Sequence, residues 1–254
     1  MRHALAAGRP REAASAAGDL LGFAIRGPLP FGRFAADAEE LLSLGEPISG
    51  SVGHALMAAA ALAAGDDPGF GEHEERWRDV LSRHGLPWCA ATHGLWIASV
   101  ETSVGMAEAA ERRLREAREF LAPLGNVWWL RMVDGYLCEA VRAQDRPREF
   151  LRLADAFAAS VLLTDRGTLI ERQLLLAKAQ LIRGSAAEAE AAARRALELV
   201  ESTDFVTEHA NALLTLADSL EARDLGDEAA AAREEAVAKL RAKGNLAAVA
   251  RLGG

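Results

Sequence analysis

The sequence of 254 residues has few β-branched aliphatic side chains, with only 12 Val and 5 Ile. Val and Ile favour strands, whereas Ala and Leu, which together fill more than a third of the positions, head the scale of helix formers. A fold built mainly from sheets is therefore excluded, and we predict an all-α protein.

Cysteine and basic residues are also scarce. Two Cys cannot form a disulfide framework or a four-cysteine zinc site. Acidic residues outnumber basic ones by 37 to 29, which gives a formal net charge of −8. A nucleic-acid-binding protein needs a basic surface to displace counterions, so we expect no nucleic-acid partner.

Long apolar runs are missing as well. The N-terminus has no stretch that resembles the apolar core of a signal peptide. The longest segment without a formal charge is 47–65, and its length would fit a membrane span. Its residues are mostly Ala, Gly and Ser, which gain little on entering lipid. We therefore interpret it as a helix packed between two others, and we expect a cytoplasmic protein without membrane contact.

The chain contains an internal repeat. Residues 174–200 can be laid on residues 214–240 without a gap, and nine of the 27 positions are identical. A further copy lies 79 residues before the first. Turn-forming residues recur at intervals close to 40, and each interval holds two runs of helix length. The period predicts a chain of helical hairpins.

Small residues recur at fixed places inside these copies. In each of three copies, Ala is followed by Ala after 12 and again after 7 positions, as in Ala98, Ala110 and Ala117. The same spacing occurs at Ala177, Ala189 and Ala196, and at Ala217, Ala229 and Ala236. Small side chains there would let the two helices of a hairpin approach closely. The pattern resembles the tetratricopeptide repeat, with a period near 40 rather than 34. The resemblance implies a right-handed α-solenoid of about six antiparallel hairpins, forming one domain over 1–254.

Helix start and stop signals divide the chain further. Thr168 with Glu171, and Ser185 with Glu188, have the form of capping boxes, and Gly244 is placed to end a helix in the left-handed conformation. We expect helices over 10–25, 31–44, 51–64, 72–84, 87–104, 106–122, 126–144, 147–160, 166–183, 186–202, 205–222 and 227–243, with a short one over 246–252.

The last 50 residues carry a more specific resemblance. The run Thr203-Asp204-Phe205, followed by His209-Ala210, and the run Lys243-Gly244-Asn245 resemble the C-terminal tetratricopeptide-like arm of bacterial adenylate-cyclase-associated AAA proteins and related signalling regulators. The resemblance implies interaction or sensing rather than catalysis. The chain has no GxxxxGK[ST] phosphate loop. We therefore expect a piece of a longer array, from a bacterial signalling or transcription-regulatory protein.

Residues that could carry out chemistry are not grouped in the sequence. His84, Cys89 and His93 are the one tempting metal cluster, but a fourth ligand is not nearby, and free Cys is commonly a small buried residue. We predict a protein that is not an enzyme, with no catalytic residues, no metal and no cofactor. Some tetratricopeptide domains grip a terminal carboxylate with Lys and Asn. The matching positions here include Leu174 and Lys178 and do not form that basic clamp.

The aromatic residues are the best candidates for a binding site. All five Trp and the single Tyr lie between positions 77 and 136. In the repeat frame, two adjacent helices would line a concave groove with Trp88, Thr92, Trp96, Trp128, Met132 and Tyr136. Aromatic anchors with a few polar groups suit recognition of a peptide or small molecule. The opposing interpretation is that these rings fill space between Ala-rich helices, in which case they would be buried.

Three hypotheses for function follow from this pattern. The leading one is a protein-interaction or regulatory domain that displays this groove to a protein or peptide. The second is a sensor that binds a small-molecule effector in the same groove. The third is an oligomerisation module, in which a second copy of the chain is the partner.

Overall fold

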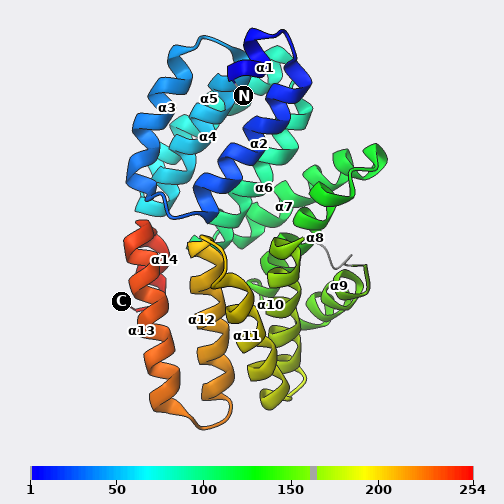
Figure 1. The fold of residues 1–254 in the computed structure, drawn as a ribbon, viewed down its shortest axis with the longest axis vertical. Coiled ribbons are helices and arrows are strands. Elements are labelled where there is room, and N and C mark those ends of the chain that lie inside the picture. Colours follow the sequence, from blue (N-terminus) through cyan, green and yellow to red (C-terminus); the bar gives the residue numbers. More distant parts are fainter. Residues whose placement is uncertain (1, 161–164, 254) are drawn as a thin grey trace.

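The computed structural model describes residues 2–160 and 165–253, and every regular element in these ranges is a helix (Figure 1). The predicted all-α class is therefore confirmed. The elements are α1 (Arg2–Ala6), α2 (Pro10–Arg26), η1 (Phe31–Arg33), α3 (Phe34–Ser43), α4 (Pro47–Ala64), α5 (Asp67–His84), α6 (Pro87–Val104), α7 (Ala107–Leu121), η2 (Ala122–Leu124), α8 (Val127–Arg142), α9 (Pro147–Ser160), α10 (Arg166–Ile182), α11 (Ala186–Val200), α12 (Val206–Glu221), α13 (Gly226–Lys243) and α14 (Leu246–Arg251).

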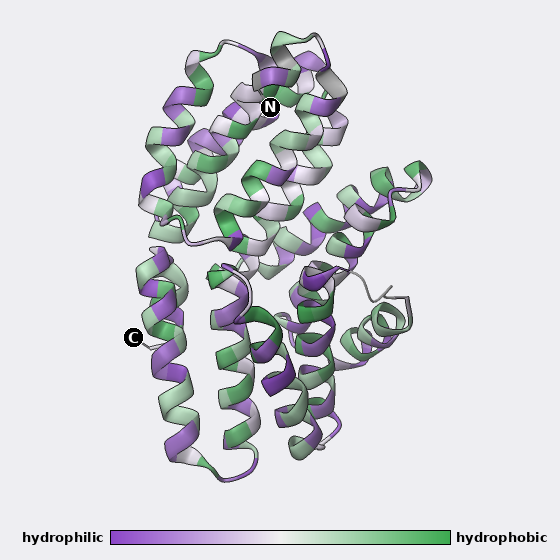
Figure 2. Ribbon diagram, viewed as in Figure 1, coloured by the Kyte–Doolittle hydropathy of each residue, from purple (hydrophilic) through white to green (hydrophobic). Residues whose placement is uncertain are grey.

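Helices that follow one another in the sequence pack as antiparallel pairs. The most extensive contacts join α4 to α5, α6 to α7, α10 to α11 and α12 to α13. The nine Ala predicted at close helix contacts are all buried: Ala98, Ala110, Ala117, Ala177, Ala189, Ala196, Ala217, Ala229 and Ala236. A methyl group at these positions lets the helix axes come close, and Leu side chains then fill the wider spaces. In Figure 2, hydrophilic residues recur among the hydrophobic ones along α10 to α13.

Residues in the left-handed conformation end most of these helices. Gly105 follows α6 with φ of 99°, and Gly244 follows α13 with φ of 80°, as predicted for Gly244. Asp145 and Asp224 adopt the same conformation, with φ of 55° and 61°, although they carry side chains. Asp and Asn are the residues with side chains that tolerate this region best. The turns that contain these residues are therefore short and sharp.

Two helices begin earlier than their sequence predicts. The expected starts at 51 and 72 are wrong, because α4 begins at Pro47 and α5 at Asp67. Proline fits the first turn of a helix, where no intrahelical partner for its nitrogen exists. The carboxylate of Asp66 also accepts a hydrogen bond from the Gly69 amide at 3.1 Å, and this contact caps α5.

The helix caps also differ from the predicted boxes. Asp165, rather than Thr168, is the N-cap of α10, and its carboxylate accepts the Thr168 amide at 2.8 Å. Ser185 precedes α11 but its side chain makes no capping hydrogen bond. The capping-box pattern therefore locates the start of α11 but places that of α10 three residues too late, and it misassigns the capping atoms of both helices.

Helix α4 is the apolar segment whose length would fit a membrane. Among the described residues it is the one helix that is long and apolar enough to cross a bilayer, and 61% of it is buried inside the protein. It packs against α2, α3, α5 and α6. Its composition is thus accounted for by a position in the core.

Helix α2 joins the N-terminal and C-terminal parts of the chain, because it contacts α4, α6 and α12 (Figure 1). The buried ammonium group of Lys243 donates to the carbonyl oxygens of Ala24, Gly27 and Leu29 at 2.6, 2.8 and 2.5 Å. These carbonyls lie at and just beyond the end of α2, where a helix leaves acceptors unpaired. A cation from the C-terminal part of the chain thus caps a helix from the N-terminal part.

Candidate functional site

The six residues of the predicted groove occupy different environments. Thr92, Trp96 and Met132 are buried, with 0%, 1% and 6% of their surface exposed. Trp88 and Tyr136 are half-buried, and Trp128 is 38% exposed. A ligand would therefore reach Trp88, Trp128 and Tyr136 in part, whereas the other three belong to the core.

The rings nevertheless form one cluster, whose centre is a residue outside the predicted groove. Trp129 makes edge contacts with Trp88, Trp96 and Trp128, with centroids 6.2, 6.3 and 4.8 Å apart. Tyr136 lies against Trp96 at 5.8 Å. Such edge-to-face pairs add to the free energy gained by burial. The cluster joins α6 to α8 and so stabilises the middle of the chain.

Helix α2 covers this cluster. A Cβ placed on Gly22 would lie 2.5 Å from Cζ2 of Trp96, and one on Gly18 would lie 3.0 Å from Cη2 of Trp129. Only glycine lets the α2 backbone lie this close to the indole rings. The face of α6 that the repeat frame assigns to a groove is therefore occupied by a helix of the same chain.

A polar centre lies where α2 meets α8, α10 and α12. Arg26 forms a buried ion pair with Glu208, and its guanidinium lies 3.9 Å from the centroid of the Phe205 ring. The Tyr136 hydroxyl donates to the same carboxylate at 3.5 Å. Burial raises the pKa of Glu171 to about 7, and the negative charge of neighbouring carboxylates acts in the same direction. One oxygen of Glu171 and one of Glu208 are buried without a hydrogen-bond partner among the described residues.

A row of charges, which we call the charged strip, crosses α8, α10 and α12. It consists of Glu139, Arg142, Lys178 and Asp218. The Lys178 ammonium donates to Glu139 Oε1 at 2.8 Å, and Arg142 Nε donates to Glu139 Oε2 at 3.1 Å. These contacts hold the pKa of Glu139 at about 2, although burial opposes the shift. Glu139 therefore stays ionised, and the strip carries fixed charges of both signs.

The charged strip borders a cleft of about 200 Å³. Arg142, Lys178 and Asp218 line it from three helices, and Ile182 adds an apolar wall that is 41% exposed. Asp145 and Arg146 also line the cleft, which thus combines three cations, two carboxylates and an apolar contact within reach of solvent. This combination suits a polar segment of polypeptide with one apolar side chain.

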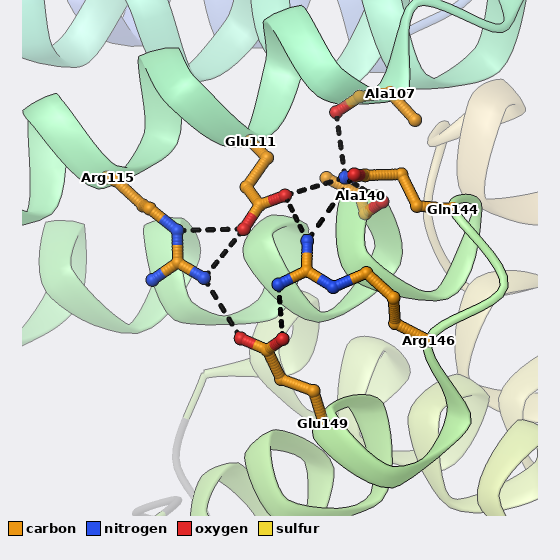
Figure 3. Close-up of polar contacts among 7 residues, drawn as sticks. All are labelled: Ala107, Glu111, Arg115, Ala140, Gln144, Arg146 and Glu149. Carbon is orange, nitrogen blue, oxygen red and sulfur yellow. Dashed lines mark hydrogen bonds and ion pairs between the residues drawn. The ribbon is translucent and has the colours of Figure 1, made fainter.

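A second group of charges has a structural role. Glu111, Arg115, Arg146 and Glu149 form a closed ring in which each carboxylate contacts two guanidinium groups (Figure 3). The Gln144 amide also donates to Glu111 at 2.7 Å. Burial opposes ionisation of Glu111, but hydrogen bonds from Gln144 and the two arginines hold its pKa below the ordinary value. Two carboxylates balance two guanidinium groups, so the ring fastens α7 to the turn before α9 and leaves no excess charge.

The sequence contains a signal for the charged strip that the groove hypothesis does not use. Glu139, Lys178 and Asp218 are 39 and 40 residues apart, so they occupy the same place in successive copies of the repeat. The comparison with carboxylate-binding tetratricopeptide domains considers only whether the repeat positions carry Lys or Asn. Charges at equivalent repeat positions become neighbours when hairpins stack, and a search for them would find the strip.

The candidate metal cluster is not assembled. Cys89 and His93 are buried in α6, whereas His84 at the end of α5 is exposed. Among the described residues, the structure contains no group of three or more His, Cys, Asp and Glu that could hold a metal ion.

No model of a known protein family matches the chain, and no curated protein matches it.

Proposed function

We propose that this protein is a non-catalytic helical-repeat domain that binds a polypeptide partner. Its hairpins would form a right-handed, tetratricopeptide-like solenoid with a period near 40. The starts of α8, α10 and α12, at residues 127, 166 and 206, support that period. A role in bacterial signalling or regulation, at a cytoplasmic location, rests on the resemblance of the last 50 residues.

The charged strip is the observation that carries the proposal. Its charges come from three successive hairpins and border a cleft open to solvent. The side chains of Arg142 and Asp218 are 41% and 58% exposed, whereas the Glu139–Lys178 pair below them is largely covered. Charges at the rim of a cleft can select a partner by electrostatic complementarity. A polypeptide with complementary acidic and basic side chains would fit it, with one apolar side chain against Ile182.

An exchange of charges tests this assignment. The double variant Glu139→Lys, Lys178→Glu keeps an ion pair between positions 139 and 178, but it removes the carboxylate beside Arg142 and reverses the charge that Lys178 presents to the cleft. Its control, Glu235→Lys with Lys239→Glu, exchanges an ion pair on α13 between an exposed Glu235 and a half-buried Lys239, whose atoms are 3.5 Å apart. Immobilised protein would be exposed to a lysate of the source cells, and the retained polypeptides would be quantified.

We expect a polypeptide that is retained by the wild type and by the control variant but lost from the strip variant. Equal retention by all three proteins would contradict the proposal, and so would a wild type that retains nothing. Circular dichroism of the variants separates a loss of binding from a loss of fold.

A small-molecule effector in the aromatic cluster is the alternative function. Because Gly22 packs directly on Trp96, such a ligand would have to displace α2 or bind beside Trp88 and Trp128 at the edge of the cluster. Native mass spectrometry of protein purified from its source would detect it as a retained mass of a few hundred daltons. Dimeric protein in the same spectrum would instead favour the oligomerisation module.

A further inference from the structure

A second cleft, of about 300 Å³, lies between α7 and α9 above α8. We call it the arginine pocket and define it by Arg118 from α7, Arg131 and Asp134 from α8, and Arg152 from α9. Leu137 and Phe157 supply apolar surface between these polar groups. Its lining residues do not overlap with those of the cleft beside the charged strip.

The charges of the arginine pocket do not balance. Arg118 donates to one oxygen of Asp134 at 2.7 Å, and Arg131 donates to the other at 3.4 Å. Arg152 has no ion-pair or hydrogen-bond partner among the described residues. Three guanidinium groups therefore face one carboxylate, which leaves an excess of two positive charges in a protein whose formal net charge is −8.

Nearby side chains do not remove this excess. Arg115 also borders the pocket, but Glu111 and Glu149 of the ion-pair ring already neutralise it. Within the described part of the chain, Nε of Arg131 is buried and has no hydrogen-bond acceptor. A buried donor without an acceptor is costly, so an oxyanion that accepts from Arg131 would remove a penalty as well as add a contact.

Guanidinium groups recognise oxyanions through paired N–H donors. A phosphate monoester carries between one and two negative charges near neutral pH and so matches an excess of two, whereas a monocarboxylate supplies one. The volume corresponds to the lower end of small-molecule sites, and the apolar surface favours an organic body on the phosphate. We propose that the arginine pocket binds a small phosphate monoester with an apolar group.

Phenyl phosphate is a suitable probe, because it joins a phosphate monoester to one apolar ring. Binding would be measured by isothermal titration calorimetry on the whole chain, with inorganic phosphate, benzoate and a phosphoserine peptide in parallel titrations. We expect phenyl phosphate to bind more tightly than inorganic phosphate and than benzoate. Tighter binding of the phosphoserine peptide would overturn the small-molecule assignment in favour of a phosphorylated protein.

Three variants test the role of the charges. Arg152→Gln, on the exposed side of α9, should weaken binding of phenyl phosphate by about tenfold through loss of a charge-assisted contact. Asp134→Asn should tighten binding, because it removes the one carboxylate that competes with the ligand for Arg118 and Arg131. The control is Arg112→Gln, since Arg112 is exposed on α7 and does not line the pocket.

Opposite effects of Arg152→Gln and Asp134→Asn, with no effect of Arg112→Gln, would establish the site. Absence of saturable binding at millimolar phenyl phosphate would overturn it, as would equal losses in all three variants. Tighter binding by Asp134→Asn cannot come from damage to the fold, so this variant keeps the test decisive even if another one is destabilised. The strip variant Glu139→Lys, Lys178→Glu should bind phenyl phosphate normally, so the two proposals can fail separately.

Discussion

Because α2 lies so close to the aromatic cluster, we predict the effect of adding a single methyl group at Gly22. Gly22 lies inside a helix, where Ala is more favourable than Gly by about 1 kcal/mol. On helix propensity alone, Gly22→Ala would therefore stabilise the protein. The new Cβ would lie 2.5 Å from Cζ2 and 2.6 Å from Cε2 of Trp96, a side chain with 1% exposure and little room to move.

The contact should outweigh the helix propensity. Overpacking of a filled core costs about 1–3 kcal/mol, and a rigid indole ring places this site at the upper end. After subtraction of the helix term, we expect Gly22→Ala to destabilise the protein by about 2 kcal/mol. Gly71→Ala is the matched control, because Gly71 lies inside α5 and the added methyl group would have no neighbouring atom within 4 Å. We expect it to stabilise by about 0.5–1 kcal/mol.

Urea unfolding followed by tryptophan fluorescence would measure both effects. All five Trp lie in the part of the chain that packs around α6 and α8, so the signal reports on the relevant region. The same substitution in a Trp96→Leu background should lose most of its cost, because the ring that it contacts is gone. If Gly22→Ala stabilised the protein as much as Gly71→Ala, α2 would not lie against Trp96, and the account of the covered cluster would be refuted.

Three further predictions concern buried groups. Arg26→Met should destabilise the protein by about 3–5 kcal/mol in urea unfolding because Glu208 would keep an unpaired buried charge, and Arg26→Met with Glu208→Leu should cost less than the single variant. The pKa of Glu171 is about 7 in the folded protein against an ordinary 4.5, so Glu171 binds its proton more tightly when the protein is folded. Its contribution to stability is therefore present below pH 4.5 and is lost as the pH rises to about 7. Relative to wild type, Glu171→Gln should therefore gain stability across that window, by at most about 3 kcal/mol, and an unchanged difference at pH 4.5 and 7 would contradict the shift. Burial raises the pKa of the Cys89 thiol to about 11 and also raises the pKa of the Cys138 thiol. Iodoacetamide should therefore label neither thiol at neutral pH until urea unfolds the protein. Rapid labelling of the native protein would show that α6 or α8 opens readily.

Local signals predict most of the helices, because they depend on residues close together in the chain. The left-handed turn at Gly244 and the buried face of Ala177, Ala189 and Ala196 can be located from residue type and spacing. The wrongly predicted starts of α4 and α5 also come from residues close together in the chain. Pro47 and Asp66 are local signals too, but the Gly-rich sequence after them favours a turn when it is considered alone.

The candidate site could also be predicted from the sequence only in part. The sequence places Trp88, Trp96 and Tyr136 on neighbouring helices, and these rings do lie together. It could not show that α2 covers Trp96, because three α-helices and a 3-10 helix lie between α2 and α6 in the sequence. Exposure of an aromatic face depends on which distant element packs on it, and helical periodicity carries no information about that choice.

By itself, the sequence determined the all-α class, the positions of most helix ends and the small residues at helix contacts, since each follows from backbone preference and periodicity. Tertiary structure alone decided which charges became neighbours outside the register of the repeat. Lys243 reaches the carbonyl of Ala24 across 219 positions, and Arg118, Arg131 and Arg152 gather around Asp134 from three helices. Such contacts depend on the angles and distances between packed helices. These are set by the fit of many side chains at once.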